Sequence, residues 1–141
     1  MSTEANKALV RRYREAHTTN NLALLDEVIA ADIKSHSGLP GLPSGLQGGK
    51  MVNRTFLAAF PNGLVTTEDL IAEGDQVVER FSFRGTNTGS LMHAPATGKK
   101  VTFSGVSVFR IAHGKIVEHW GAHDAFGSTL SMMVFDTHMA I

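Results

Sequence analysis

The spacing of apolar residues changes once along the chain, close to residue 61, and this change limits the possible folds more than any other feature. Before it, apolar side chains recur every three or four residues, which is the spacing of an amphipathic helix. After it, apolar and polar residues alternate, as they do in a half-buried strand. The chain is therefore expected to place helices first and a β-sheet second, an α+β layout.

Three segments carry the helical spacing. The first is capped by Thr3 and ends at the polar residues 17–21, the second is expected over 22–30, and the third over 49–60. A short strand that carries His36 is expected over 33–37. The four longer strands are expected over 64–73, 75–86, 99–111 and 115–124. Gly74 and Gly114 stand where tight hairpins need a positive φ angle, so these strands form an antiparallel meander.

The stretch GLPGLPSGLQGG, residues 38–49, is too rich in glycine and proline for a regular element. Its three leucines provide apolar side chains, so we expect residues 37–49 to form a lid loop; a disordered loop is the alternative. Residues 128–141 are rich in methionine and are expected to be a strap, a dimer contact or a loose tail. Nothing divides residues 1–141 into parts, which predicts a single domain.

Composition excludes several classes of protein. The chain has 13 basic and 13 acidic residues, so it lacks the basic surface expected of a nucleic-acid-binding protein. It has no cysteine, which excludes disulfides and thiolate metal sites. No apolar run is long enough for a membrane span, and the charged N-terminal segment does not resemble a signal peptide. We therefore expect a cytoplasmic protein that contacts neither nucleic acid nor membrane.

A long antiparallel sheet needs an apolar cover on one face, and the three predicted helices are the cover available. If the sheet curves strongly around them it forms a cone, and the mouth of the cone is a pocket. The polar groups that point into this cone then decide what the protein does.

The last predicted strand ends at Asp124, beside apolar neighbours. Strict alternation would place Ile116, Glu118, Trp120 and Asp124 on one face, unless a bulge, for example at Gly121, intervenes. Burial there would raise the pKa of the Asp124 carboxyl, which suits a general acid or base. The alternative is a carboxylate that caps the following turn.

The chain resembles the SnoaL-like polyketide cyclases, members of the NTF2-like (cystatin-like) superfamily of α+β cones. The resemblance covers residues 5–130 and rests on an ordered series of motifs: LIAEGDQVV from Leu70, RGT from Arg84, TGKKV from Thr97, FRI from Phe109, GKIVEHW from Gly114, and finally Asp124. It implies three N-terminal helices packed on a strongly curved antiparallel sheet that encloses a pocket.

The resemblance also implies a reaction. Characterised cyclases of this family close the last ring of an aromatic polyketide by an intramolecular aldol condensation without metal or cofactor. Asp124 matches their acid/base aspartate, and His36 matches a polar position expected to contact a substrate oxygen. Asn87 stands where the family often has histidine, so it is expected to bind a carbonyl and not to move a proton. His93 lies in an altered loop motif and is a further candidate contact.

Several aromatic and histidine side chains are further candidates, judged by their positions in the predicted helices and strands. Trp120, Phe56 and Phe60 are candidates to line a pocket for a hydrophobic substrate, although most phenylalanines belong to the core. His119 and His123 lie about 13 Å apart on a strand and cannot share a zinc ion, so no metal site is expected. Alternation places His119 opposite Asp124, at an interface or in solvent, and His17 lies at the end of a helix.

Three alternatives remain open at this stage. A ketosteroid-isomerase-like enzyme would pair an aspartate with Tyr13, the one tyrosine of the chain. An epoxide-hydrolase-like enzyme would need a second inward aspartate beside an arginine. A non-catalytic module would bind a small molecule only. A homodimer is expected through the outer sheet face, where Thr102, Ser104, Val106 and Val108 form a partly apolar surface.

Overall fold

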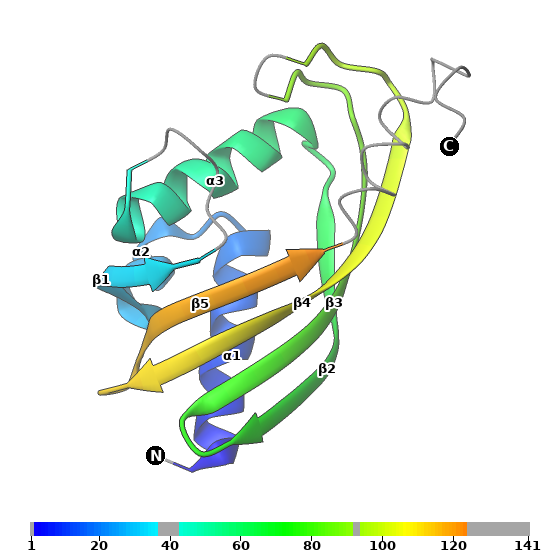
Figure 1. Ribbon diagram of the computed structural model, residues 1–141. Helices are drawn as coiled ribbons and strands as arrows, with labels where there is room; N and C mark the ends of the chain where they lie inside the picture. Colours follow the sequence, from blue (N-terminus) through cyan, green and yellow to red (C-terminus); the bar gives the residue numbers. More distant parts are fainter. Residues whose placement is uncertain (1, 37–42, 92–93, 124–141) are drawn as a thin grey trace.

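Three helices and five strands make up the computed structural model, which describes residues 2–36, 43–91 and 94–123 of the 141-residue chain (Figure 1). The helices are α1 (Thr3–Thr18), α2 (Leu22–Val28) and α3 (Gly45–Ala59). The strands are β1 (Ile29–Ser35), β2 (Leu64–Glu73), β3 (Gln76–Thr86), β4 (Lys100–Ala112) and β5 (Lys115–His123). The predicted α+β class is confirmed.

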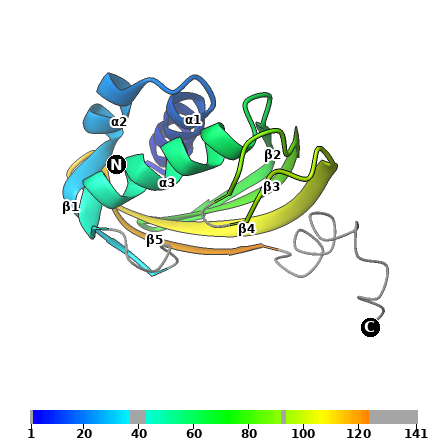
Figure 2. The same ribbon diagram turned by 90° about the horizontal axis from the view of Figure 1, so that it is seen from above.

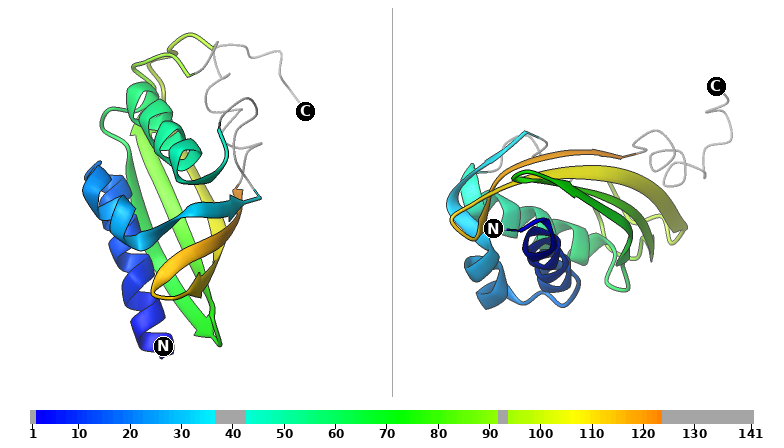
Figure 3. Two further views of the ribbon diagram at one scale, coloured as in Figure 1. Left: turned by 90° about the vertical axis from the view of Figure 1, so that its left-hand side faces the viewer. Right: turned by 90° about the horizontal axis from the view of Figure 1, so that it is seen from below.

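The strands form one sheet in the order β1-β5-β4-β3-β2. β2 to β5 are an antiparallel meander, as predicted, but β1 pairs with β5 in parallel, so the sheet is mixed and not wholly antiparallel. Parallel pairing needs a long connection, and α3 with the first three strands of the meander supplies it. The sheet curves, and all three helices lie on its concave side (Figures 2 and 3).

Local sequence sets most element ends. Ser2, and not Thr3, caps α1, because its Oγ accepts a hydrogen bond from the backbone N of Ala5 at 3.1 Å. The two-residue turns take the positive φ angles expected of tight hairpins, at Gly74 in the first, and at both His113 and Gly114 in the second. α2 ends at Val28, earlier than predicted, because Ile29 enters β1.

α3 begins at Gly45 and not at Gly49, so the last five residues of the predicted lid are helical. Leu46 is buried and holds this first turn against the core. Gly45 has a φ of +74°, and a Cβ atom there would lie 2.7 Å from the Ala31 carbonyl oxygen, so glycine allows the helix to begin close to β1. Residues 37–42 of the lid, and the tail 128–141, lie outside the described residues.

The core has two parts. The larger joins α1, α2 and α3 to the sheet and contains Leu9, Val10, Ala16, Leu25, Val28, Ile29, Leu46, Val77, Phe109, Ile111 and Ile116. The smaller is an aromatic cluster under the far end of α3, made of Ala59, Phe60, Phe83 and Val101 with Phe56 and Phe103 packed against it. The pocket described next lies beside the larger part.

Candidate active site

A pocket of about 840 Å³ opens between the end of α1, β1, the start of α3 and the adjoining strands β4 and β5. This volume is within the range of sites that hold small organic molecules. Its lining is mostly apolar and includes Ile29, Ile33, Leu46, Val52, Phe109 and Ile116. Tyr13, His17 and His119 contribute aromatic polar groups to the same lining.

Tyr13 and His17 lie one turn apart on α1, so they share the helix face that meets the sheet. Their ring centroids are 4.4 Å apart in an edge-to-face arrangement. Tyr13 also packs on Phe109 of β4, with centroids 5.0 Å apart. These contacts fix both side chains through the packing of α1 on the sheet.

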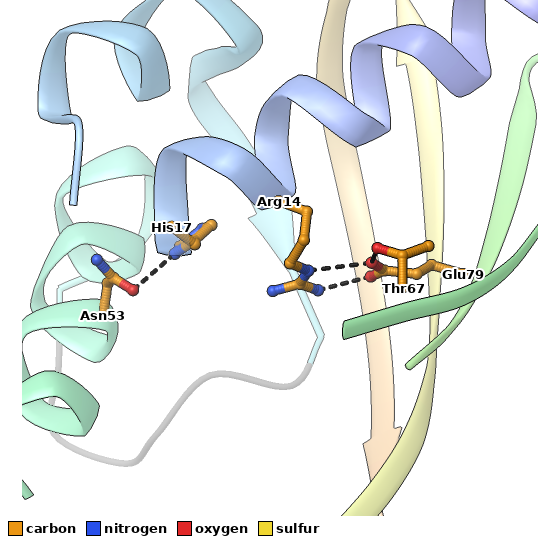
Figure 4. A network of polar contacts seen from close by, with 5 residues as sticks. All are labelled: Arg14, His17, Asn53, Thr67 and Glu79. Atoms are coloured by element: carbon orange, nitrogen blue, oxygen red, sulfur yellow. Dashed lines mark hydrogen bonds and ion pairs between the residues drawn. The ribbon is translucent and has the colours of Figure 1, made fainter. Parts of the chain in front are cut away.

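A short chain of hydrogen bonds orients the His17 ring. His17 Nδ1 lies 2.9 Å from Asn53 Oδ1 (Figure 4). Asn53 Nδ2 in turn donates to Asn20 Oδ1 at 3.1 Å. Because the amide oxygen of Asn53 can only accept, His17 Nδ1 carries the proton. In a neutral ring Nε2 is then an acceptor.

His119 reaches the pocket because β5 contains a bulge. Arg110 pairs with Glu118, but the next residue, Ile111, pairs with Ile116, so Val117 is an extra residue in β5. The bulge puts Ile116 and His119 on the concave face. The prediction that Ile116 shares a face with Glu118 and Trp120 is therefore wrong, as is the placement of His119 at an interface or in solvent. The bulge is at Val117 and not at Gly121.

Burial governs the charge state of this wall. It lowers the pKa of His17 to about 4, against the hydrogen bond to Asn53, and the positive charge of Arg14 acts in the same direction. Burial likewise lowers the pKa of His119 to about 4. Burial raises the pKa of Tyr13. All three groups are therefore uncharged near neutral pH and act through hydrogen bonds.

His119 also carries an unfilled hydrogen-bonding group. Its Nε2 atom is buried and has no hydrogen-bond partner within the described part of the chain. Its ring stacks on Phe109, with centroids 5.0 Å apart. Buried polar atoms are seldom left unpaired, so the position points to a ligand, a water molecule or a functional role.

A buried ion pair stands next to Tyr13. Arg14 donates from Nε and Nη2 to the two carboxylate oxygens of Glu79, at 3.0 and 2.6 Å, and Thr67 Oγ1 donates to Glu79 Oε2 at 2.7 Å (Figure 4). The Glu79 side chain has no exposed surface. The pair joins α1 to β3 and β2 and neutralises the one carboxylate that β3 buries under α1.

Two of the predicted site residues, His36 and Trp120, contact each other away from Tyr13, His17 and His119. The His36 ring stacks on Trp120, with centroids 4.8 Å apart, and His36 Nε2 lies 2.7 Å from Glu118 Oε2. Arg110 Nε donates to the other oxygen of Glu118 at 2.9 Å. Because Phe109 and His119 face the concave side, Arg110, Glu118 and Trp120 face the convex side. His36 contributes to the rim of the pocket, whereas Trp120 is not part of its lining.

The remaining candidates lie elsewhere. Asn87 is buried in the connection after β3, where its amide donates to Gly89 O at 2.8 Å and accepts from the backbone N of Thr97 at 2.9 Å. It holds this loop and does not line the pocket. Phe56 and Phe60 belong to the aromatic cluster. Asp124 and His93 lie outside the described residues.

The structure thus adds His17 and His119 to Tyr13 as polar groups at the pocket, and Asn53 as the hydrogen-bond partner of His17. The sequence offered a weak signal for His17, which is four residues after Tyr13 on a helix and therefore on the same face. Asn53 had no such signal, because its role depends on how α3 packs against α1. Over the described ranges, no group of three or more metal-binding side chains is present, and no helix is long and apolar enough to span a membrane.

Comparison with solved structures finds this fold in proteins of low sequence identity. TsrD from Streptomyces laurentii is 22% identical with a TM-score of 0.85, over 94% of this chain and 97% of that one. IdmH from Streptomyces antibioticus, a proposed polyketide cyclase, is 28% identical with a TM-score of 0.76, over 92% and 96% of the two chains. AclR from Streptomyces galilaeus, a proposed hydroxylase, is 26% identical with a TM-score of 0.80, over 94% and 83%.

Comparison with curated proteins gives no match. The profile of the family described as SnoaL-like polyketide cyclase matches residues 7–130, which is most of the chain. The motifs of the sequence, the curved sheet with its helices and the neighbouring structures agree with this match. The chain therefore belongs to the SnoaL-like polyketide cyclase family.

Proposed function

We propose that this chain catalyses a cofactor-free intramolecular aldol condensation, which closes a ring of an aromatic polyketide or a related polycyclic ketone. The observation that carries the proposal is the pocket of about 840 Å³, apolar over most of its lining and edged by uncharged tyrosine and histidine side chains. Family membership supports the same chemistry. The fold alone does not fix the reaction, because the structural neighbour AclR is a proposed hydroxylase.

The reaction needs one proton to be moved twice. A carbon between two carbonyl groups loses a proton to a base, the resulting enolate attacks a ketone or aldehyde carbon, and the new alkoxide takes a proton back. The C–H bond is already acidic, so a single carboxyl group can serve as base and then as acid. The family resemblance gives this role to Asp124, with His36 at the rim as the second candidate.

The pocket would contribute mainly by holding the substrate. Its apolar walls exclude water and keep the two reacting carbons close together. Tyr13, His17 and His119 provide hydrogen bonds to oxygen atoms of the substrate without adding charge to the pocket. These three groups suit a substrate that enters and leaves as a neutral molecule; the lining also includes Asp32 and Lys34 of β1.

Deuterium exchange tests this proposal directly. The protein is mixed in D₂O with an anthraquinone-type β-keto ester or a Δ5-ketosteroid, and exchange at the acidic C–H is followed by NMR. We expect acceleration by the wild type and a loss of about 10²- to 10⁴-fold in Asp124→Asn, which keeps the shape of the side chain. Equal acceleration by both proteins would remove Asp124 from the mechanism, and no acceleration by the wild type would refute the proposed chemistry.

We also propose that the convex sheet face joins two copies of the chain. Thr102, Ser104 and Val106 are exposed on this face, and Val106 is 42% exposed. Val106 and the half-buried Val108 give this strip of β4 the apolar surface that a second copy would cover. Light scattering should give a dimer mass for the wild type and a monomer mass for Val106→Lys; a monomeric wild type would refute the dimer.

A further inference from the structure

His17 and Asn53 form a hydrogen-bonded unit that transfers no proton in the proposed reaction. Asn53 is 8% exposed and lies on α3, and its amide bridges His17 and Asn20 at the end of α1. Such a partner on one ring nitrogen fixes which tautomer the other nitrogen presents. The unit is therefore suited to recognition, because it determines whether His17 offers a donor or an acceptor to the pocket.

The directions of these hydrogen bonds determine whether His17 Nε2 is a donor or an acceptor. Asn53 donates its Nδ2 protons towards Asn20, which leaves its Oδ1 to accept from His17 Nδ1. His17 Nε2 consequently carries a lone pair and no proton. A carbonyl oxygen of a ligand cannot pair with this atom, because both would be acceptors, whereas a hydroxyl group can donate to it.

We propose that His17 Nε2, held as an acceptor by Asn53, binds a phenolic or enolic hydroxyl group of the substrate and thereby selects hydroxylated ring systems over their methyl ethers. The inference rests on the proposed function, in that a polycyclic polyketide occupies the pocket. Phenols and enols are the hydroxyl groups that such a ring system carries.

Two further observations support the proposal. His17 contributes to the lining of the pocket, and among the described residues its ring makes one hydrogen bond, through Nδ1. On the same wall, the buried Nε2 atom of His119 has no partner within the described ranges. The protein therefore leaves hydrogen-bonding capacity unfilled on both imidazoles, as a wall that receives a polar ligand does.

Burial keeps the lone pair of His17 Nε2 available at neutral pH. Because the pKa of His17 falls to about 4, the ring is neutral at neutral pH and Nε2 is not protonated. A site built around one polar group rejects the analogue that cannot complete the bond more strongly than an apolar site would. Selection by hydroxyl content is the expected consequence.

Three small probes separate the polar contact from ring binding: 1-naphthol, 1-methoxynaphthalene and naphthalene. Calorimetric titration of the wild type should give a Kd for 1-naphthol on the order of tenfold below those of the other two. His17→Phe keeps an aromatic ring against Tyr13 and removes the acceptor, so 1-naphthol should lose this advantage while naphthalene binding is retained. His113→Asn, at an exposed turn, is the matched control and should bind as the wild type does.

A second pair of variants tests the role of Asn53. Asn53→Gln keeps an uncharged amide oxygen that can accept from His17 Nδ1 and should keep most of the preference for 1-naphthol. Asn53→Leu removes that oxygen and should reduce the preference several-fold, and the ¹⁵N shifts of the His17 ring should show protonation moving to Nε2. Thermal unfolding shows whether each variant is folded.

Several results would overturn the proposal. They are a wild type that binds the methyl ether as tightly as 1-naphthol, a preference that survives in His17→Phe, or no binding of any probe. The deuterium exchange experiment judges the proposed reaction separately. Exchange that depends on Asp124, together with an unchanged preference in His17→Phe, would leave the reaction standing and remove this inference alone.

Discussion

Histidine side chains occupy two environments in this protein, one buried inside the pocket and one exposed at its rim. On the concave side, His17 and His119 are enclosed by α1, Phe109 and the pocket, and burial lowers the pKa of each to about 4. At the rim of the pocket, His36 is 45% exposed and its Nε2 lies 2.7 Å from a carboxylate oxygen of Glu118, which faces the convex side. The hydrogen bonds from His36 and Arg110 lower the pKa of Glu118 and keep this carboxylate charged.

This difference shows what each face is suited to do. A buried imidazole without a carboxylate stays neutral and offers a lone pair or an N–H group to a ligand. The exposed imidazole of His36, packed against a carboxylate and a tryptophan ring, joins the end of β1 to β5. One residue type is therefore suited to binding inside the pocket and positions the edge strand at the rim.

The largest expected effect concerns the carboxylates of the two faces. Glu79→Ala would leave Arg14 buried without its partner, so we expect it to lower the free energy of unfolding by about 3–5 kcal/mol. Asp69→Ala breaks an ion pair with Arg80 in which both side chains are 57% exposed, and should cost less than about 1 kcal/mol. Urea unfolding of the two variants measures both values.

The double variant Arg14→Met/Glu79→Leu is the control for the buried pair. It removes both charges together and should be much more stable than Glu79→Ala, because no isolated charge remains. Equal losses for Glu79→Ala and Asp69→Ala would contradict the contrast between the two faces.

The next largest effect is a pH dependence of the free energy of unfolding, caused by His17 on the concave side of the sheet. In the unfolded chain His17 titrates near 6.5, and in the folded chain near 4. Between these values the unfolded state binds a proton that the folded state does not, so the free energy of unfolding falls as the pH falls from about 6.5 to 4. His17 should contribute a loss of about 2–3 kcal/mol by pH 4.5.

Comparison with His17→Phe isolates this contribution, because the other titrating groups are common to both proteins. Urea unfolding at pH 7, 5.5 and 4.5 should show that the stability difference between the two proteins shifts by that amount in favour of His17→Phe at low pH. Curves that stay parallel over this range would mean that His17 is not buried and neutral in the folded chain.

The sequence predicted the sheet better than the site. Strands β2 to β5 lie within one residue of their predicted bounds, because alternation and two-residue hairpins are local properties. The parallel pairing of β1 with β5 joins residues about 85 positions apart, for example Ser35 with His119. The local spacing of apolar residues cannot predict such a pairing. Likewise, Leu46 anchors the first turn of α3 although three of the first five residues of this helix are glycines.

The site was missed for a related reason. One extra residue, Val117, reverses the faces of the residues after it in β5 relative to strict alternation. Trp120 therefore lies on the convex side and His119 in the pocket, the opposite of what alternation predicts. The alternation of apolar and polar residues cannot locate a bulge when the residues beside it could lie on either face of the sheet. The hydrogen bond between His17 and Asn53 depends in turn on the packing of α1 against α3, which is known only once the fold is.

The smallest expected effect tests whether the two faces act independently. Trp120 is the one tryptophan of the chain, so its fluorescence reports on the contact with His36. Glu118→Leu removes the carboxylate that holds the His36 ring and should change this fluorescence, whereas Glu118→Gln keeps an acceptor and should change it less. Because Glu118 faces the convex side, the Kd of 1-naphthol should change less than about twofold in either variant. If Glu118→Leu instead weakened 1-naphthol binding as much as His17→Phe does, the rim and the pocket would form one coupled site and the contrast between the faces would fail.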